Sequence, residues 1–226
     1  MPWRDWIRTV EVEPSLYAAD FNRLGEQIDV LLDAGTRVFH FDVGDGHFVE
    51  PVTIGPIVLQ SIAPRIHVVD GAVIDCHLMV DNPTHHFRQI KNAGGDSVTF
   101  HYEAVDDVAA TIAEARMLGL GVGIAFNPES DPADVARVAD GADIVLCMSI
   151  HPGYSGQAFM PDALERIRTL RERLPEEITI QVDGGIDQGN IRDVYDAGAR
   201  LFVAGNAIFA RDDLREAYDG LVQALQ

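Results

Sequence analysis

The sequence alternates short apolar runs with longer segments of helical period along its length, and this regularity constrains the fold more than any other feature. Each apolar run has the length and the β-branched content of a strand. The predicted strands cover residues 10–16, 38–43, 73–80, 97–103, 121–126, 143–150, 178–184 and 201–209. The predicted helices begin at Asp20 after the first strand and then cover residues 84–92, 106–118, 131–139, 161–174, 188–197 and 212–225.

Strands that alternate with helices pair in parallel through right-handed crossovers. A doubly wound open sheet is the competing architecture, but no G-x-G-x-x-G motif follows an early strand. Eight strand–helix units of similar length instead favour closure into a single (β/α)8 TIM barrel. We therefore predict one domain over residues 1–226. Residues 1–9 form an N-terminal extension, whose Trp3 and Trp6 are expected to pack under the barrel or to join an interface.

The composition excludes several classes of protein. The first ten residues mix charges with apolar side chains and lack the apolar core of a signal peptide, and no run is long enough to cross a bilayer. The net charge of −19 disfavours a nucleic-acid partner, because phosphates demand clustered Lys and Arg. Both cysteines, Cys76 and Cys147, fall in apolar runs and are expected to be buried free thiols. These features predict a cytoplasmic protein that binds neither nucleic acid nor membrane.

Polar residues gather near the ends of the predicted strands, where the chemistry of a (β/α)8 barrel is located. The second strand offers His40 and Asp42, which point to one face because they are two residues apart. Other strands add Ser15, Asp75, His77 and Asp183. A lone buried His–Asp pair would explain H-x-D by itself. Two histidines and two aspartates from three strands, however, can converge on one divalent ion of the zinc, iron or manganese type.

Two further histidines stand at strand ends. His101 closes the fourth predicted strand, where we expect a structural hydrogen bond, with a place in the site as the alternative. His151 opens the loop after the sixth strand, where it faces either the substrate or the solvent.

Three glycine-bearing stretches follow the last three predicted strands. They read HPGYSGQ (151–157), DGG (183–185) and AGN (204–206). Glycine lets the backbone approach an anion closely, and the loops after strands seven and eight of such barrels often bind phosphate through backbone N–H groups. An acidic protein can thereby hold a phosphate without a basic cluster.

These residues resemble the ribulose-phosphate 3-epimerase family nearly end to end. The resemblance is carried, in order, by PSLYAADF, HFDVGDGHFVEPVTIGP, DCHLMV, DSVTFHYEA, MSIHPGYSGQAF, QVDGGI and VAGNAIF. It implies a (β/α)8 barrel with one divalent metal ion, Zn2+ before Fe2+ or Mn2+. The implied reaction inverts C3 of a ketose phosphate, converting D-ribulose 5-phosphate into D-xylulose 5-phosphate through an enediolate. The implied assembly is a homo-oligomer, a dimer or a hexamer.

The resemblance also implies roles for individual residues. The implied metal ligands are His40, Asp42, His77 and Asp183. Asp42 and Asp183 would form the acid–base pair, one on each face of the substrate. The implied substrate contacts are Ser15, His77, Met79, Met148, Gly153, Tyr154, Ser155, Gly156, Asp183, Gly184, Gly185, Gly205 and Asn206.

Five positions depart from the usual pattern of the family: Gly44, His151, Tyr154, Ser155 and Asn206. Gly44 replaces a methionine that caps the intermediate, so we expect open space beside the metal, with His151 or Tyr154 available to refill it. These departures make another ketose phosphate, such as D-allulose 6-phosphate, an alternative substrate.

Single residues disfavour the other functions of related barrels. Lyases and decarboxylases of the phosphate-binding barrels carry D-x-K-x-x-D, but His77 stands here at the position of the lysine. A Schiff-base aldolase needs a lysine in the barrel, and Lys91, the only lysine, lies near a helix end. A non-catalytic sugar-phosphate-binding paralogue would have lost a metal or acid–base residue, and none is lost.

Overall fold

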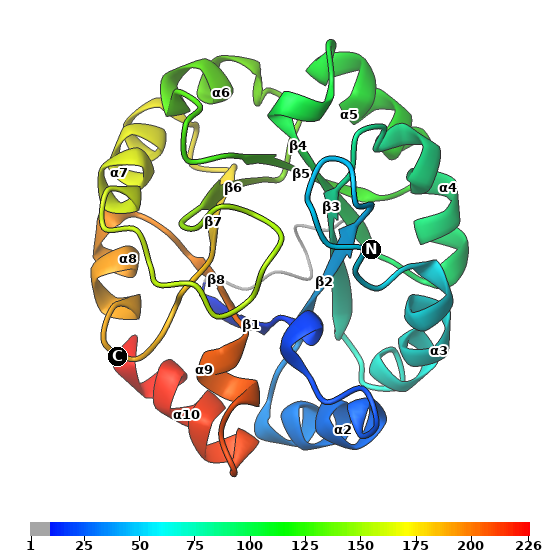
Figure 1. Ribbon diagram of the computed structural model, residues 1–226. Coiled ribbons are helices and arrows are strands. Elements are labelled where there is room, and N and C mark those ends of the chain that lie inside the picture. Colours follow the sequence, from blue (N-terminus) through cyan, green and yellow to red (C-terminus); the bar gives the residue numbers. More distant parts are fainter. Residues whose placement is uncertain (1–9) are drawn as a thin grey trace.

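A computed structural model describes residues 10–226, whose strands form one parallel sheet curled into a barrel (Figure 1). The strands are β1 (Glu11–Pro14), β2 (Val38–Gly44), β3 (Val73–Met79), β4 (Ser97–His101), β5 (Gly121–Phe126), β6 (Ile144–Met148), β7 (Thr179–Asp183) and β8 (Leu201–Ala204). They pair in the order β1-β8-β7-β6-β5-β4-β3-β2. A parallel bridge between Ser15 and His40 links the two ends of this order, so the barrel is nearly closed. The predicted (β/α)8 fold is confirmed.

Helices surround the barrel on its outside (Figure 1). They are α2 (Leu24–Ala34), α3 (Pro56–Ile66), α4 (Thr84–Ala93), α5 (Val108–Met117), α6 (Pro132–Val138), α7 (Ala163–Arg173), α8 (Ile191–Ala197), α9 (Asn206–Phe209) and α10 (Leu214–Ala224), with short 3-10 turns η1 (Leu16–Ala18) and η2 (Tyr102–Ala104). None of the helices over residues 10–226 is long and apolar enough to cross a membrane.

Side chains and glycines at the helix ends explain where several helices begin and stop. The carboxylates of Asp107, Asp131 and Asp213 accept hydrogen bonds from backbone N–H groups in the first turns of α5, α6 and α10. Gly35 and Gly94 end α2 and α4 in the left-handed conformation, which only glycine adopts without cost. The dipeptides Ala34–Gly35 and Ala93–Gly94 therefore mark the ends of α2 and α4.

Two elements differ from the sequence prediction. No helix is predicted after the second strand, yet α3 lies there. Pro56 suits the first turn of a helix. Pro64 lies inside α3, and because proline usually breaks a helix, it makes this segment hard to predict as one. The last predicted strand, 201–209, is wrong in its second half, since β8 ends at Ala204 and α9 begins at Asn206. The apolar pattern continues across this change, so hydropathy alone does not reveal it. The predicted N-terminal extension, residues 1–9, lies outside the described residues.

Buried apolar side chains lie on both sides of the sheet. Outward-facing side chains such as Phe39, Phe41 and Phe100 are fully buried against the helices. Inside the barrel, a separate apolar cluster is formed by the first residues of β2, β3, β6 and β8, which are Val38, Val73, Ile144 and Leu201. This cluster fills the amino end of the barrel, so the polar residues further along the same strands face the other end. The thiols of Cys76 and Cys147 are buried and free, as predicted.

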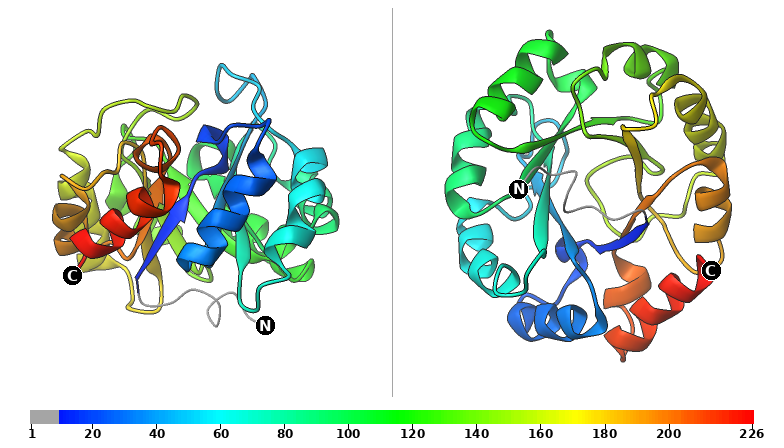
Figure 2. Two further views of the ribbon diagram at one scale, coloured as in Figure 1. Left: turned by 90° about the horizontal axis from the view of Figure 1, so that it is seen from below. Right: turned by 180° about the vertical axis from the view of Figure 1, so that it is seen from behind.

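The loops that follow the carboxyl ends of the strands lie together at one end of the barrel (Figure 2, left). Residues far apart in the sequence meet there. Gly153, in the loop after β6, lies close to Val49 and Pro51 of the loop after β2. This end of the barrel therefore carries the candidate site.

Candidate active site

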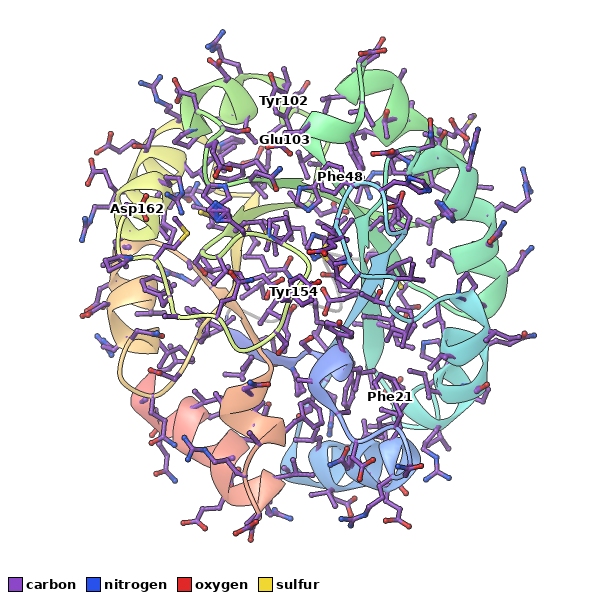
Figure 3. The ribbon with its side chains drawn as sticks, in the orientation of Figure 1. Phe21, Phe48, Tyr102, Glu103, Tyr154 and Asp162 are labelled. Carbon is purple, nitrogen blue, oxygen red and sulfur yellow. The ribbon has the colours of Figure 1, made fainter. Side chains whose placement is uncertain are left out.

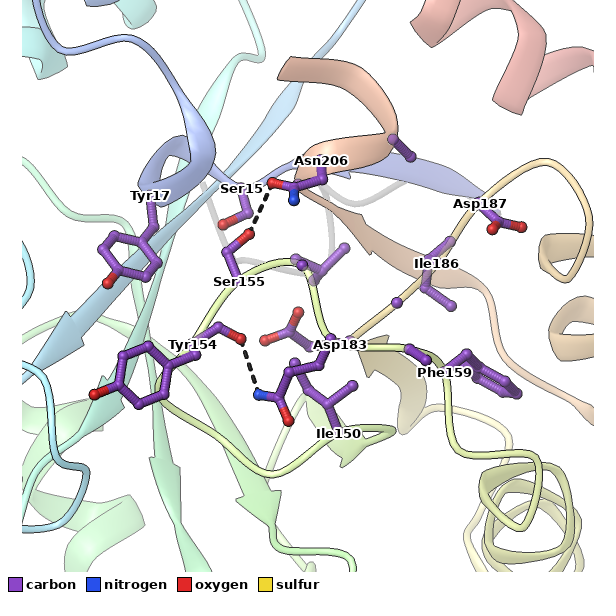
Figure 4. A pocket seen from close by; sticks show the side chains of 18 of the residues that line it. Ser15, Tyr17, Ile150, Tyr154, Ser155, Phe159, Asp183, Ile186, Asp187 and Asn206 are labelled. Atoms are coloured by element: carbon purple, nitrogen blue, oxygen red, sulfur yellow. Dashed lines mark hydrogen bonds between the residues drawn. The ribbon is translucent and has the colours of Figure 1, made fainter. Parts of the chain in front are cut away.

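A cavity of about 540 Å3 opens at the carboxyl ends of the strands (Figure 4). The carboxylates of Asp42 from β2 and Asp183 from β7 lie in its wall. The other predicted residues that line it are Ser15, Met79, Met148, Gly153, Tyr154, Ser155, Gly156, Gly184, Gly185, Gly205 and Asn206. The structure thus brings these candidates around one cavity.

Two fully buried histidines, His40 and His77, stand beside these carboxylates. His40 Nε2 lies 3.2 Å from Asp42 Oδ1 and 3.9 Å from Asp183 Oδ2. His77 Nδ1 lies 3.2 Å from Asp42 Oδ1 and 3.6 Å from Asp183 Oδ2. This arrangement follows from strand register, because β2 and β3 pair with Asp42 opposite His77.

This group of four has the composition of a divalent metal centre. One ligand atom from each residue lies within 4.8 Å of all the others. Both ring nitrogens of His40 are buried and lack a hydrogen-bond partner among the described residues. A buried polar nitrogen without a partner is costly, and a cation facing Nε2 would satisfy it. Two carboxylates would also balance the charge of a divalent ion, so the residues present fit one.

The members of this group shift one another's pKa values. Burial works to lower the pKa of His40, but Asp42, Asp75 and Asp183 outweigh it and raise that pKa well above its usual value. Burial also works to lower the pKa of His77, and Asp183 and Asp42 again raise it. Burial works to raise the pKa of Asp42, yet His40 and His77 hold it well below its usual range. Asp42 is therefore ionised at neutral pH, as a ligand or a base must be.

A second polar layer lies behind His40. Its Nδ1 faces Asp75 Oδ2 at 3.4 Å and Glu13 Oε2 at 3.9 Å. Asp75 in turn accepts hydrogen bonds from Ser97 Oγ at 2.6 Å and Gln181 Nε2 at 2.9 Å. With a divalent ion on Nε2, these acceptors would hold the remaining ring proton of His40 on Nδ1. Asp75, one of the strand-end candidates, thus supports His40 and does not line the cavity.

Two members of this layer, Glu13 and Gln181, are absent from the sequence-based candidates. Gln181 Nε2 donates to Glu13 Oε2. Burial, and then the charge of Asp75, raise the pKa of Glu13 well above its usual value. The alternation of acids in VEVEP (10–14) is the signal that could have found Glu13, once one face of the first strand is known to point inward.

His101 is fully buried at the end of β4 and makes the predicted structural hydrogen bond. Its Nε2 lies 2.8 Å from His77 Nε2, and its Nδ1 lies 3.3 Å from Glu103 Oε2. Burial, opposed only in part by Glu103, lowers the pKa of His101 to about 4. His101 therefore reaches the candidate metal centre through His77 and does not line the cavity.

The glycine-bearing loops form the opposite wall of the cavity. Ser155 Oγ donates to Asn206 Oδ1 at 3.1 Å and so joins the loop after β6 to α9 (Figure 4). Gly185 has φ +64°, and a Cβ there would collide with the backbone of Phe159. Arg211 also lines the cavity at this side and is a cation that the sequence-based candidates lack.

Three expectations for individual residues require comment. The open space expected at Gly44 is not there, because a Cβ would lie 2.9 Å from Val49 Cγ2 and 3.0 Å from Pro51 O. His151 takes the solvent-facing alternative, as it is mostly exposed and its Nε2 lies 2.8 Å from Glu129 Oε1. His77 has no exposed surface and is not part of the cavity wall.

The fold and the site define a class of protein, the (β/α)8 barrel enzymes, because the catalytic residues of such enzymes come from the carboxyl ends of the strands, where these carboxylates and imidazoles lie. Comparison with known proteins gives the particular family. The model of the ribulose-phosphate 3 epimerase family matches residues 11–209, and the chain belongs to this family. The resemblance seen in the sequence motifs is thereby confirmed, and the activity that the family brings is that of an epimerase, which is an isomerase.

Named relatives agree with this assignment. Ribulose-phosphate 3-epimerase from Escherichia coli (strain K12) is 40% identical over 211 residues, which cover 92% of this chain and 92% of that protein. Ribulose-phosphate 3-epimerase 2 from Cupriavidus necator is 35% identical and covers 97% of this chain and 92% of that protein.

Solved structures of other enzymes share the fold. 3-Hexulose-6-phosphate synthase from Salmonella typhimurium matches with a TM-score of 0.71 at 18% identity, covering 95% of this chain and 98% of that chain. Orotidine 5'-phosphate decarboxylase from Pyrococcus horikoshii OT3 matches with a TM-score of 0.68 at 20% identity, covering 95% and 98%. At these identities the likeness shows the fold alone.

Proposed function

We propose that this protein is a metal-dependent epimerase that inverts C3 of a ketose phosphate, converting D-ribulose 5-phosphate into D-xylulose 5-phosphate. The observation that carries the proposal is the convergence of Asp42 and Asp183 on one cavity beside two buried imidazoles. Family membership and the named relatives support the reaction class.

Epimerisation needs proton transfer on both sides of one carbon. Asp42 and Asp183 reach the cavity from β2 and β7, which β1 and β8 separate in the barrel. A sugar bound between them would meet one carboxylate on each side. One carboxylate then removes the C3 proton, and the other returns a proton on the opposite face, which inverts the carbon.

Hydrogen bonds hold the carboxylate of Asp42 and the backbone of Asp183 in place for this role. Ser15 Oγ donates to Asp42 Oδ2 at 2.6 Å, so one oxygen of Asp42 is fixed. Ser149 donates to the backbone carbonyl of Asp183 from its N–H at 2.8 Å and its Oγ at 3.0 Å. Positioned carboxylates lose little freedom when the substrate binds, and this favours catalysis.

A proton beside a ketone is weakly acidic, so the enediolate formed by its removal needs stabilisation. His40, Asp42, His77 and Asp183 would hold one divalent ion, Zn2+ before Fe2+ or Mn2+. When bound, such an ion supplies Lewis-acid stabilisation of the negative charge that develops on the substrate oxygens.

The glycine-bearing side of the cavity would hold the phosphate. Gly184, Gly185, Gly205 and Asn206 line it and allow close approach of the backbone to an anion. Arg211 adds a positive charge at the same side. Ser15 from the first strand end, with Met79 and Met148 across the barrel, would contact the sugar.

The choice of sugar is the part of the proposal with a real alternative. Tyr154, Ser155 and Asn206 line the cavity and depart from the usual family pattern, which favours testing another ketose phosphate such as D-allulose 6-phosphate. We also propose a homo-oligomer, a dimer or hexamer, in the cytoplasm.

The test is proton NMR of the metal-loaded protein with each sugar phosphate, before and after a chelator. Chelator-sensitive formation of D-xylulose 5-phosphate supports the proposal as stated. Conversion of D-allulose 6-phosphate alone would move the assignment to the hexulose phosphate. Failure to convert either, with phosphate binding intact, would favour a non-catalytic sugar-phosphate-binding paralogue.

A further inference from the structure

His77 makes different contacts through its two ring nitrogens. Nδ1 faces Asp42 and Asp183, whereas Nε2 lies 2.8 Å from His101 Nε2. The two imidazoles stack with ring centroids 5.0 Å apart and an interplanar angle of 21°. Both side chains are fully buried, so protein groups alone decide which nitrogens carry protons.

Glu103 determines the direction of this hydrogen bond. Its Oε1 accepts from the backbone N–H of Asn127 at 2.8 Å and from the hydroxyl of Ser130, so Glu103 is held from the loop after β5. Its Oε2 lies 3.3 Å from His101 Nδ1. An ionised carboxylate only accepts, so the proton of His101 sits on Nδ1 and its Nε2 accepts. His77 must then donate through Nε2, so in the neutral ring that binds a metal its Nδ1 carries no proton.

An aromatic side chain packs against His101. The ring centroid of Phe48, a residue of the loop after β2 (Figure 3), lies 4.6 Å from that of His101. His77, His101 and Glu103, which we call the histidine network, thus connect the candidate metal centre to the loop that carries Asn127 and Ser130. Neither His101 nor Glu103 lines the cavity.

We propose that His101 and Glu103 are positioning residues that hold His77 in the tautomer with Nδ1 free to bind the divalent ion. A ligating histidine generally donates its other ring N–H to an acceptor that fixes the ring and raises its basicity. Here the acceptor is Nε2 of His101, and the carboxylate of Glu103 determines which ring nitrogen of His101 carries the proton. The inference rests on the metal site of the proposed function.

The network allows substitutions that keep or reverse its direction. His101→Gln keeps it, because an amide oxygen can accept from His77 while its NH2 group donates to Glu103. Glu103→Gln reverses it. The donors Asn127 and Ser130 hold the amide oxygen on their side, so the NH2 group faces His101 Nδ1 and that proton must move to Nε2. Glu129→Gln is the matched control, because Glu129 forms an exposed pair with His151 outside the network.

The experiment measures the affinity of metal-depleted protein for Zn2+ by competition with a chromophoric chelator, and the visible spectrum of the Co2+ form. We expect Glu103→Gln to weaken Zn2+ binding by roughly 10- to 100-fold and to alter the Co2+ spectrum. His101→Gln should bind close to wild type, His101→Phe should match Glu103→Gln, and Glu129→Gln should be unchanged. Circular dichroism of the metal-depleted variants checks that each is folded.

The outcomes separate this inference from the proposed function. If wild-type protein binds one Zn2+ and Glu103→Gln binds equally well, the positioning role is wrong and the metal site stands. If His101→Phe binds Zn2+ as well as wild type while His101→Gln loses affinity, ring packing and not hydrogen-bond direction holds His77, which also overturns the inference. If the wild-type protein takes up no Zn2+, Fe2+ or Mn2+, the metal site itself is wrong, and the inference falls with it. Should His101→Phe fail to fold, Glu103→Gln still decides.

Discussion

Ser15 Oγ donates a hydrogen bond of 2.6 Å to Asp42 Oδ2, and this contact joins the end of β1 to the end of β2 inside the barrel. The other oxygen of Asp42 faces His40 and His77 at 3.2 Å each. Each oxygen of Asp42 therefore has its own task, and the hydroxyl of Ser15 keeps the carboxylate from rotating.

Ser15→Ala removes this donor and should lower kcat with a smaller effect on KM. A hydrogen bond to a charged group is worth about 1.5–3 kcal/mol, which corresponds to about a 10- to 100-fold change in rate. Steady-state kinetics with D-ribulose 5-phosphate measures the effect. Ser61→Ala on the exposed face of α3 is the control, since Ser61 Oγ bonds only the carbonyl of Ile57 in the same helix. Equal kcat values for the two variants would show that Ser15 does not position Asp42.

Gly44 is expected to resist even a small side chain. Besides Val49 and Pro51, Thr53 Cγ2 lies 3.1 Å from the place of a Cβ, and Thr53 Oγ1 bonds both the N–H of Gly44 and the carbonyl of Asp42. Gly44→Ala should lower the free energy of unfolding by about 1–3 kcal/mol through overpacking. Urea denaturation measures it.

Gly55→Ala is the matched control for this substitution, because nothing lies within 4 Å of a Cβ at Gly55 and its φ of −137° suits any residue. Its stability should fall less than that of Gly44→Ala, because its only cost is the poorer capping of α3 by alanine. A Gly44→Ala protein as stable as Gly55→Ala would mean that the loop after β2 yields easily. A methionine at position 44 could then also be accommodated, with the change in substrate preference that the family pattern suggests.

The ion pair between His67 and Asp96 should make stability depend on pH. The hydrogen bond of 2.8 Å from His67 Nε2 to Asp96 Oδ2 raises the pKa of His67 against partial burial. A raised pKa in the folded state gives stability that is fully present below the unfolded value of about 6.5 and is lost as the pH rises through the folded pKa. His67→Gln should therefore destabilise the protein more at about pH 6 than at about pH 9.

Urea unfolding of wild type and His67→Gln at the two pH values tests this expectation. His85→Gln on the exposed face of α4 serves as the control for loss of a surface histidine. A destabilisation by His67→Gln that is the same at both pH values would show that the charge of His67 contributes nothing.

Part of this site follows from the sequence, because strand periodicity fixes which residues share a face. His40 and Asp42 are two residues apart, and β2 and β3 pair so that Asp42 and His77 meet. Their convergence is therefore predictable once the barrel is predicted. The ends of the strands are less predictable, as the apolar run through Gly205 shows.

The support behind the site depends on long-range geometry. Glu13 becomes a buried partner of His40 only after closure of the barrel places β1 beside β2. The direction of the hydrogen bond between His77 and His101 depends on Ser130, which another loop supplies through Glu103. No local pattern encodes such contacts, so the sequence predicts the ligand set and not what orients it.

The central claim is that Asp42 and Asp183 transfer protons on opposite sides of C3. Proton NMR in D2O tests it most directly, with metal-loaded wild type, Asp42→Asn, Asp183→Asn and the surface control Asp140→Asn. Wild type and Asp140→Asn should form D-xylulose 5-phosphate that carries deuterium at C3, while each of the other variants should epimerise about 10²- to 10⁴-fold more slowly, the usual worth of a general acid or base. Near-wild-type epimerisation by either Asp42→Asn or Asp183→Asn would contradict the two-carboxylate account.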